Sequence, residues 1–125
     1  MKKIIYIFLL VICCILVGCG DNSSEKDKKF SQLDIDEQHS YLMVAAEDTI
    51  KNNLKSPSTS KFPTYNNAQF KSIGENEYEI TSYVDAENGF GATIRSYFTV
   101  KVKIDENYNE ENNGYGCNVE DVKIE

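Results

Sequence analysis

Two long stretches of alternating residues limit most strongly what this chain can fold into. In residues 77–85 and 93–105 every second side chain is apolar or small, which is the period of a β-strand with one buried face. Shorter stretches of the same kind occupy residues 69–73 and 117–124. The sequence therefore predicts a four-stranded antiparallel meander whose strands follow the order of the chain.

The connection between the two long strands contains Asn88-Gly89, which is typical of a two-residue hairpin turn. Such a turn would place Ile80 and Ile94 on opposite faces, and a half-buried sheet does not allow that slip. We therefore expect a loop of three or five residues, with Gly89 or Gly91 at positive φ. In this register the outer face pairs Glu77 and Glu79 with Lys101 and Lys103, and Tyr83 and Asp85 with Arg95.

A helix is predicted before the strands, over about residues 36–54. Apolar side chains recur there at spacings of three and four, and Met43, Ala46 and Ile50 belong to one stripe. Such a stripe buries itself against the apolar face of a sheet. The predicted fold class is therefore α+β, with one N-terminal helix packed on a four-stranded antiparallel β meander in a single domain, residues 34–125.

The ends of this helix carry recognisable signals. Asp34 or Asp36 can cap the first turn, and Pro57 stops the helix because the residue before a proline disfavours helical angles. Phe62, shortly after, is expected to return to the core. His39 is the only histidine of the chain, and we interpret it as a solvated residue of the first helical turn.

The amino-terminal segment has a different character. Two lysines, Lys2 and Lys3, precede an unbroken apolar run over residues 4–17. A helix of that length crosses only about two thirds of a hydrocarbon core ~30 Å thick, which argues against an uncleaved membrane anchor. Residues 1–18 therefore read as a signal peptide.

The tetrapeptide Leu16-Val17-Gly18-Cys19 resembles the lipobox of bacterial lipoproteins. The resemblance implies cleavage before Cys19 and a diacylglyceryl group on its thiol, with palmitate as a typical acyl chain. It also implies a lipid-anchored protein on the extracytoplasmic face of the cell membrane, held there through Cys19. Two acyl chains suffice for stable anchoring.

Residues 19–33 are mostly small or charged, and we expect a flexible tether in which packing begins at Phe30 and Leu33. Without the two lysines of the signal peptide, 11 basic residues face 20 acidic ones, which gives a formal charge of −9. Phosphate backbones and anionic lipid headgroups repel such a domain, so nucleic acid is excluded as a partner.

The cysteines point to no metal or redox site. Cys13 and Cys14 leave with the signal peptide, and Cys117 remains alone. A buried apolar filler is the favoured interpretation of Cys117, ahead of an intermolecular link or a reactive thiol. The sequence has no Cys-x-x-Cys pair, so neither a zinc ribbon nor a thioredoxin-type site is predicted.

Residues 105–116 resemble part of a calcium loop. Asp105, Asn107 and Asn109 match its first ligand positions, but Glu110 stands where glycine is needed and Gly116 where the bidentate acid is needed. We predict a solvated acidic loop here, and neither a metal nor another cofactor.

Two motifs resemble a known family. Residues 54–63, with the sequence LKSPSTSKFP, and residues 82–95, with the sequence SYVDAENGFGATIR, are similar to an uncharacterised bacterial domain found in small lipoproteins and behind zinc-ribbon segments. The resemblance covers about residues 36–104, and Ser60 and Gly89 stand where alanine and serine are expected. It implies a fold but no established activity, so it assigns no functional residue.

The predicted function is a non-catalytic binding or interaction module at the cell envelope, with an envelope protein or a wall ligand as partner. It depends on the tyrosines of the sheet, among them Tyr78, because tyrosine and arginine are enriched at interfaces. Covering of this face by another element remains open. So do two other functions: a cell-wall-acting enzyme or enzyme inhibitor, and a mobile-element lipoprotein that blocks an incoming partner. The proposed contact residues are Tyr83, Arg95, Tyr97, Asn88, Gly89, Phe90 and Gly91.

Overall fold

The structure is a computed structural model that describes residues 28–111 and 114–125. The predicted signal peptide, Cys19 and most of the predicted tether lie outside these ranges.

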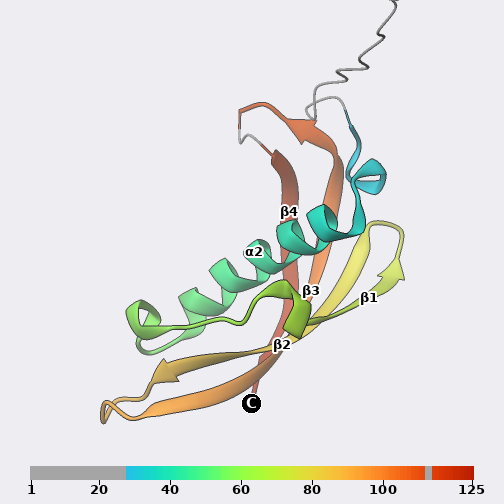
Figure 1. Cartoon of the computed structure of the whole chain (residues 1–125). Helices are drawn as coiled ribbons and strands as arrows, with labels where there is room; N and C mark the ends of the chain where they lie inside the picture. The colour runs from blue at the N-terminus through green and yellow to red at the C-terminus, as the bar shows by residue number, and fades with distance from the viewer. Residues whose placement is uncertain (1–27, 112–113) are drawn as a thin grey trace, which may run out of the picture.

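The described chain has one α-helix followed by four strands, which confirms the α+β class (Figure 1). No helix within the described ranges is both long enough and apolar enough to cross a membrane. The elements are α2 (Ile35–Asn53), β1 (Gln69–Gly74), β2 (Glu77–Glu87), β3 (Thr93–Asn109) and β4 (Gly114–Ile124), with 3-10 turns η2 (Phe30–Gln32), η3 (Pro57–Thr59) and η4 (Tyr65–Asn67).

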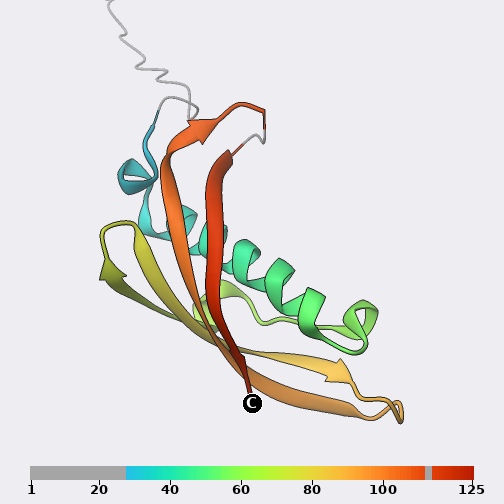
Figure 2. The same cartoon turned by 180° about the vertical axis from the view of Figure 1, so that it is seen from behind.

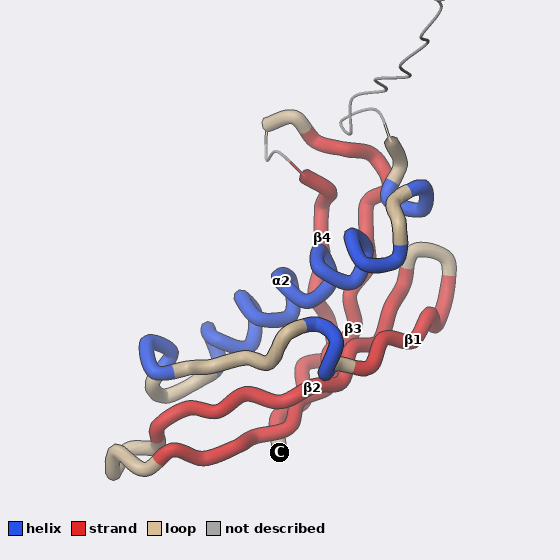
Figure 3. The backbone as a smooth tube through the Cα atoms, viewed as in Figure 1, coloured by secondary structure: helices blue, strands red, loops and turns tan. Residues whose placement is uncertain are grey.

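The four strands form one antiparallel sheet in the order β1-β2-β3-β4, as predicted (Figure 3). β2 and β3 pair without interruption from Glu77 opposite Lys103 to Glu87 opposite Thr93. Viewed from either side, the far end of this hairpin extends away from the amino-terminal end of α2 (Figures 1 and 2). The sheet is thus a long curved layer built around β2 and β3.

One hydrophobic cluster joins the helix to the inner face of the sheet. From Ile80 to Val84 and from Phe98 to Ile104 every even-numbered residue is buried and its odd-numbered neighbours are half-buried or exposed, as the period of two requires. The apolar stripe of α2 contributes the other half of the cluster. Burial of each large aliphatic side chain stabilises the fold by roughly 1.5–3 kcal/mol. The central members are Leu42, Met43, Ala46, Ile50, Ile80, Val84, Phe98, Val100, Val102 and Ile104.

Both ends of α2 follow the predicted signals. The Asp34 side chain accepts a hydrogen bond from the Glu37 N–H at 2.9 Å, and the Glu37 side chain accepts one from the Asp34 N–H at 3.3 Å. This reciprocal capping box satisfies two N–H groups that the first turn leaves unpaired. After Asn53 the backbone becomes extended, and Pro57 begins the turn η3.

The amino-terminal part of the described chain is fixed by Phe30. Its side chain is completely buried and meets the rings of Tyr41, Tyr78 and Tyr115 edge to face, at centroid distances of 5.5–6.3 Å. Packing therefore begins inside the range 19–33 that the sequence assigns to a tether. Tyr78 belongs to this cluster on the core side, so it does not take part in an outer contact surface.

Three local predictions are wrong. His39 is half-buried, and its ring stacks on that of Phe70 of β1 with centroids 4.0 Å apart, so it is not the solvated residue that the sequence predicts. Cys117 is exposed, since it lies on the edge strand β4; partial desolvation of its sulfur still raises the pKa of the thiol. Much of the expected acidic loop is strand, because Tyr108 pairs with Tyr115 and prolongs the β3–β4 ladder.

Candidate interaction site

Three of the predicted contact residues come together on the outer face of β2 and β3. Tyr83 pairs with Tyr97 across the strands, and Arg95 lies one position further along the same face. The two tyrosine rings meet edge to face, with centroids 6.2 Å apart and an interplanar angle of 66°. We call Tyr83, Arg95 and Tyr97 the tyrosine-arginine patch.

Arg95 is held in place from two directions. Its Nε and Nη2 donate to the two carboxylate oxygens of Asp85, each at 2.7 Å, and its Cζ lies 3.9 Å from the centre of the Tyr83 ring. A bidentate pair of this kind is stronger and more directional than a single hydrogen bond. The hydrogen bond from Arg95 lowers the pKa of Asp85, and the pair raises the pKa of Arg95.

The chain after α2 supports the carboxylate that orients Arg95. Lys61 and Asp85 exchange two backbone hydrogen bonds, at 2.8 and 3.0 Å, in an isolated antiparallel bridge. Next to it, the Thr59 hydroxyl accepts a hydrogen bond from the Glu87 N–H at 3.0 Å. The segment 59–61 thus covers an edge of β2 that β1 does not reach.

The tyrosine-arginine patch is open to solvent. Tyr97 is 59% exposed and the Arg95 side chain is 48% exposed. Further along the same face the side chains form ion pairs, such as Lys103 with Glu77 at 3.0 Å. In the described ranges this face is therefore solvated and mostly charged, with the two tyrosines as its aromatic part.

One predicted pair on this face has a different partner. Lys101 lies opposite Glu79 in the register, but its ammonium group bonds the carboxylate of Asp121 at 2.7 Å. The ladder shifts between Thr99 and Lys101, and Asp121 has a φ of 50°, which is typical of a β-bulge. An irregularity of this kind leaves no signal in an alternating pattern.

The loop at the tip of the hairpin has five residues, 88–92, as one of the two predicted lengths requires. The Asn88 side chain accepts hydrogen bonds from the N–H groups of Phe90 and Ala92, at 2.9 and 3.0 Å. Gly91 has the predicted positive φ, 78°. Four residue pairs separate this loop from Tyr83 and Tyr97, so it lies about 15 Å along the strands from them.

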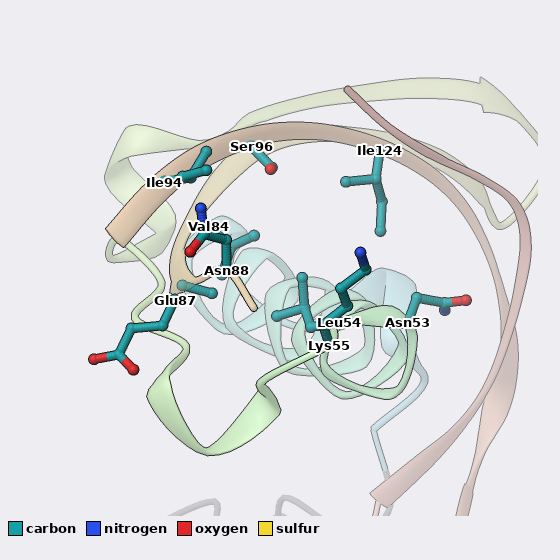
Figure 4. Close-up of a pocket in the computed structure, with 10 residues that line it drawn as sticks. Asn53, Leu54, Lys55, Val84, Glu87, Asn88, Ile94, Ser96 and Ile124 are labelled. Carbon is teal, nitrogen blue, oxygen red and sulfur yellow. The ribbon is translucent and has the colours of Figure 1, made fainter. Parts of the chain in front are cut away.

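A groove lies between the carboxyl-terminal end of α2 and the inner face of the hairpin. It encloses about 300 Å³ and presents mainly apolar atoms. Figure 4 shows Ile94, Ser96 and Ile124 on one side of the hollow and Leu54 and Lys55 on the other. Sequence reasoning missed this groove, because the residues that line it come from four separate segments. Its lining consists of Asn53, Leu54, Lys55, Val84, Ala86, Glu87, Asn88, Ile94, Ser96 and Ile124.

The candidate calcium ligands are occupied by local contacts. The Asp105 side chain accepts a hydrogen bond from the Asn107 N–H at 3.0 Å, and that of Asn109 accepts one from the Glu111 N–H at 2.9 Å. Within the described ranges, no three His, Cys, Asp or Glu side chains are grouped so that they could hold a metal ion.

Comparison with protein-family models, with curated proteins and with solved structures finds no match to this chain.

Proposed function

We propose that the chain is a lipid-anchored bacterial lipoprotein that acts as a non-catalytic binding module on the extracytoplasmic face of the cell membrane. The lipobox at Cys19 supports the anchor. The observation that carries the binding role is the tyrosine-arginine patch, in which an exposed Tyr97 lies beside a guanidinium group that Asp85 already orients.

The patch suits recognition for a physical reason. Tyrosine offers a large rigid contact area with few torsions to immobilise, and Arg95 needs no further ordering because Asp85 and Tyr83 fix it. The ion pairs along the same face would form a polar rim around an aromatic centre. An envelope protein or a wall ligand with planar and polar groups fits this surface.

The position of Phe30 supports an outward orientation of the patch. Phe30 fixes the amino-terminal segment at one end of the sheet, whereas the tip of the β2–β3 hairpin lies at the other end (Figures 1 and 2). Residues 19–29 span at most roughly 40 Å when fully extended. In a domain anchored through Cys19 the amino-terminal end would thus lie within that reach of the membrane, with the hairpin at the opposite end of the sheet.

The test is photo-crosslinking in intact cells with a photoreactive amino acid at position 97 of the full chain. We expect one envelope protein, or wall material, to be captured, and we expect capture to fall at least tenfold for Tyr83→Ala. The control places the photoreactive residue at Val44, which is 59% exposed on α2. Equal capture from positions 97 and 44, or unchanged capture by Tyr83→Ala, would contradict the proposal.

A Cys19→Ala variant tests the anchor separately. It should move the protein from the membrane fraction to the soluble fraction and remove the acyl mass from its amino terminus. Absence of the acyl mass from the amino terminus of the unchanged chain would contradict lipidation without bearing on the binding patch. Purified wall fragments added to the soluble variant then distinguish a wall ligand from a protein partner.

A further inference from the structure

Phe90 is the most exposed large apolar side chain in the described ranges, with 98% of its surface open to solvent. It does not lie on a loose segment, because the Asn88 side chain accepts hydrogen bonds from the Phe90 and Ala92 N–H groups. The Asn88 N–H also donates to the Ala92 carbonyl, and the Asn88 carbonyl accepts from the Gly91 N–H. The hairpin therefore holds an aromatic ring in water on a well-formed support, so insertion of this ring into another surface would cost little ordering of the backbone.

The groove beside this tip has the complementary shape. Asn88, from the same loop, lines it, and Ile94 on its wall is 49% exposed although it lies on the inner face of the sheet. Its space of about 300 Å³ between apolar walls can take an aromatic side chain. Phe90 itself does not line the groove of its own chain. One hairpin therefore carries both a projecting ring and an apolar hollow.

The charges at the rim of the groove are also self-complementary. Lys55 and Glu87 both line it, both are exposed, and neither forms an ion pair with another residue of the described ranges. A surface with one free cation and one free anion can meet a copy of itself around a two-fold axis, so that each charge faces its opposite.

We propose that two copies of this chain associate through the β2–β3 hairpin, with Phe90 of each copy in the groove of the other. Lys55 then faces Glu87 of the partner subunit on both sides of the axis. The inference shares the loop 88–91 with the proposed function and rests on it to that extent, but it leaves Tyr83 and Tyr97 free for another partner. Anchoring in one membrane would favour this contact by raising the local concentration of both copies.

Charge reversal tests the two-fold arrangement with Phe90 intact. Two differently tagged copies of the full chain are expressed together, fixed with formaldehyde on the membrane and isolated through one tag. We expect Lys55→Glu and Glu87→Lys each to lower co-isolation at least fivefold, and the double variant to restore it. Mixing one copy of each single variant should also restore it, because both contacts of the mixed dimer then join opposite charges. Failure of the double variant to recover would overturn the arrangement.

A photoreactive amino acid at position 90 then identifies the occupant of the groove. Crosslinks to Leu54, Ile94 or Ile124 of a second copy support the proposal. Crosslinks to a different molecule, or none above the level of position 44, overturn it. Capture at position 97 is unaffected by either result, so the proposed function and the self-association fail or survive separately.

Discussion

The guanidinium of Arg95 and the carboxylate of Asp85 form a two-point pair in which both N–O distances are 2.7 Å. The two residues face each other in the β2–β3 ladder, so the backbone register and the side chains select the same arrangement. Asp85 is also bridged to Lys61 through its backbone. Asp85 therefore orients Arg95 through its side chain and ties β2 to the segment after α2 through its backbone.

The first prediction concerns the pH dependence of this pair. The hydrogen bond from Arg95 lowers the pKa of Asp85 below the ordinary value of 3.8. The stabilising effect of the pair is therefore complete above pH 3.8 and is lost as the pH falls through the lowered pKa of Asp85. Asp85→Asn should lower the unfolding temperature at pH 7 and make no difference at strongly acidic pH. In an Arg95→Gln background the same substitution should have little effect at either pH; an equal loss in both backgrounds would assign the effect to another partner.

The second prediction concerns the start of the packed core. Phe30→Ala should lower the free energy of unfolding by roughly 3–5 kcal/mol, because a completely buried ring leaves a cavity. Phe90→Ala removes the same side chain from a site that is 98% exposed and should change it by less than about 0.5 kcal/mol. Urea unfolding measures both. Similar values for the two would mean that Phe30 is not part of the core.

The third prediction compares two neighbouring hydroxyl groups on β2. Ser82 is buried and its Oγ has no hydrogen-bond partner among residues 28–111 and 114–125, whereas the hydroxyl of Thr81 lies 3.2 Å from that of Thr99. Ser82→Ala should raise the free energy of unfolding by about 1 kcal/mol and Thr81→Ser, which keeps the hydroxyl, should leave it nearly unchanged. Thr81→Ala should lower it. A loss of stability in Ser82→Ala would reveal a partner for that hydroxyl.

The fourth prediction uses the two glycines of the hairpin loop. Gly91 has a φ of 78°, so Gly91→Ala should lower the free energy of unfolding by roughly 1–2 kcal/mol. Gly89 has open space around its Cα and no positive φ, so Gly89→Ala should be neutral or slightly stabilising. Thermal unfolding of the pair checks this, and equal effects would show that the loop has another conformation.

The sequence predicts the strands, their order and the hairpin register because all three follow from one alternating pattern. Once Ile80 and Ile94 must share a face, the length of the loop and the pairing of Tyr83 with Tyr97 are determined. The capping box at Asp34 is equally local. These features can be predicted without knowing which elements pack against each other in the folded chain.

The wrong predictions concern residues whose solvent exposure depends on which other element packs over them. The pattern gives Ile94 the same face as Phe98, yet Ile94 is 49% exposed because α2 ends at Asn53 before it reaches the tip of the hairpin. The predictions for His39 and Cys117 are wrong because the contact of His39 with Phe70 and the edge position of β4 both depend on the tertiary arrangement. Because α2 ends before the tip of the hairpin, a groove remains between the end of the helix and the sheet. This groove is apparent only in the folded chain.

The burial of Phe30 also determines how the domain responds to mechanical load. A pull on the chain at Lys28 acts first on the Phe30 side chain and on the hydrogen bond that the Tyr115 hydroxyl donates to the Lys28 carbonyl. The hydrogen bonds between the strands bear load only after the Phe30 side chain has left the core. Tension between the proposed lipid anchor and the proposed partner would therefore first lengthen the segment before α2, while the sheet stays intact.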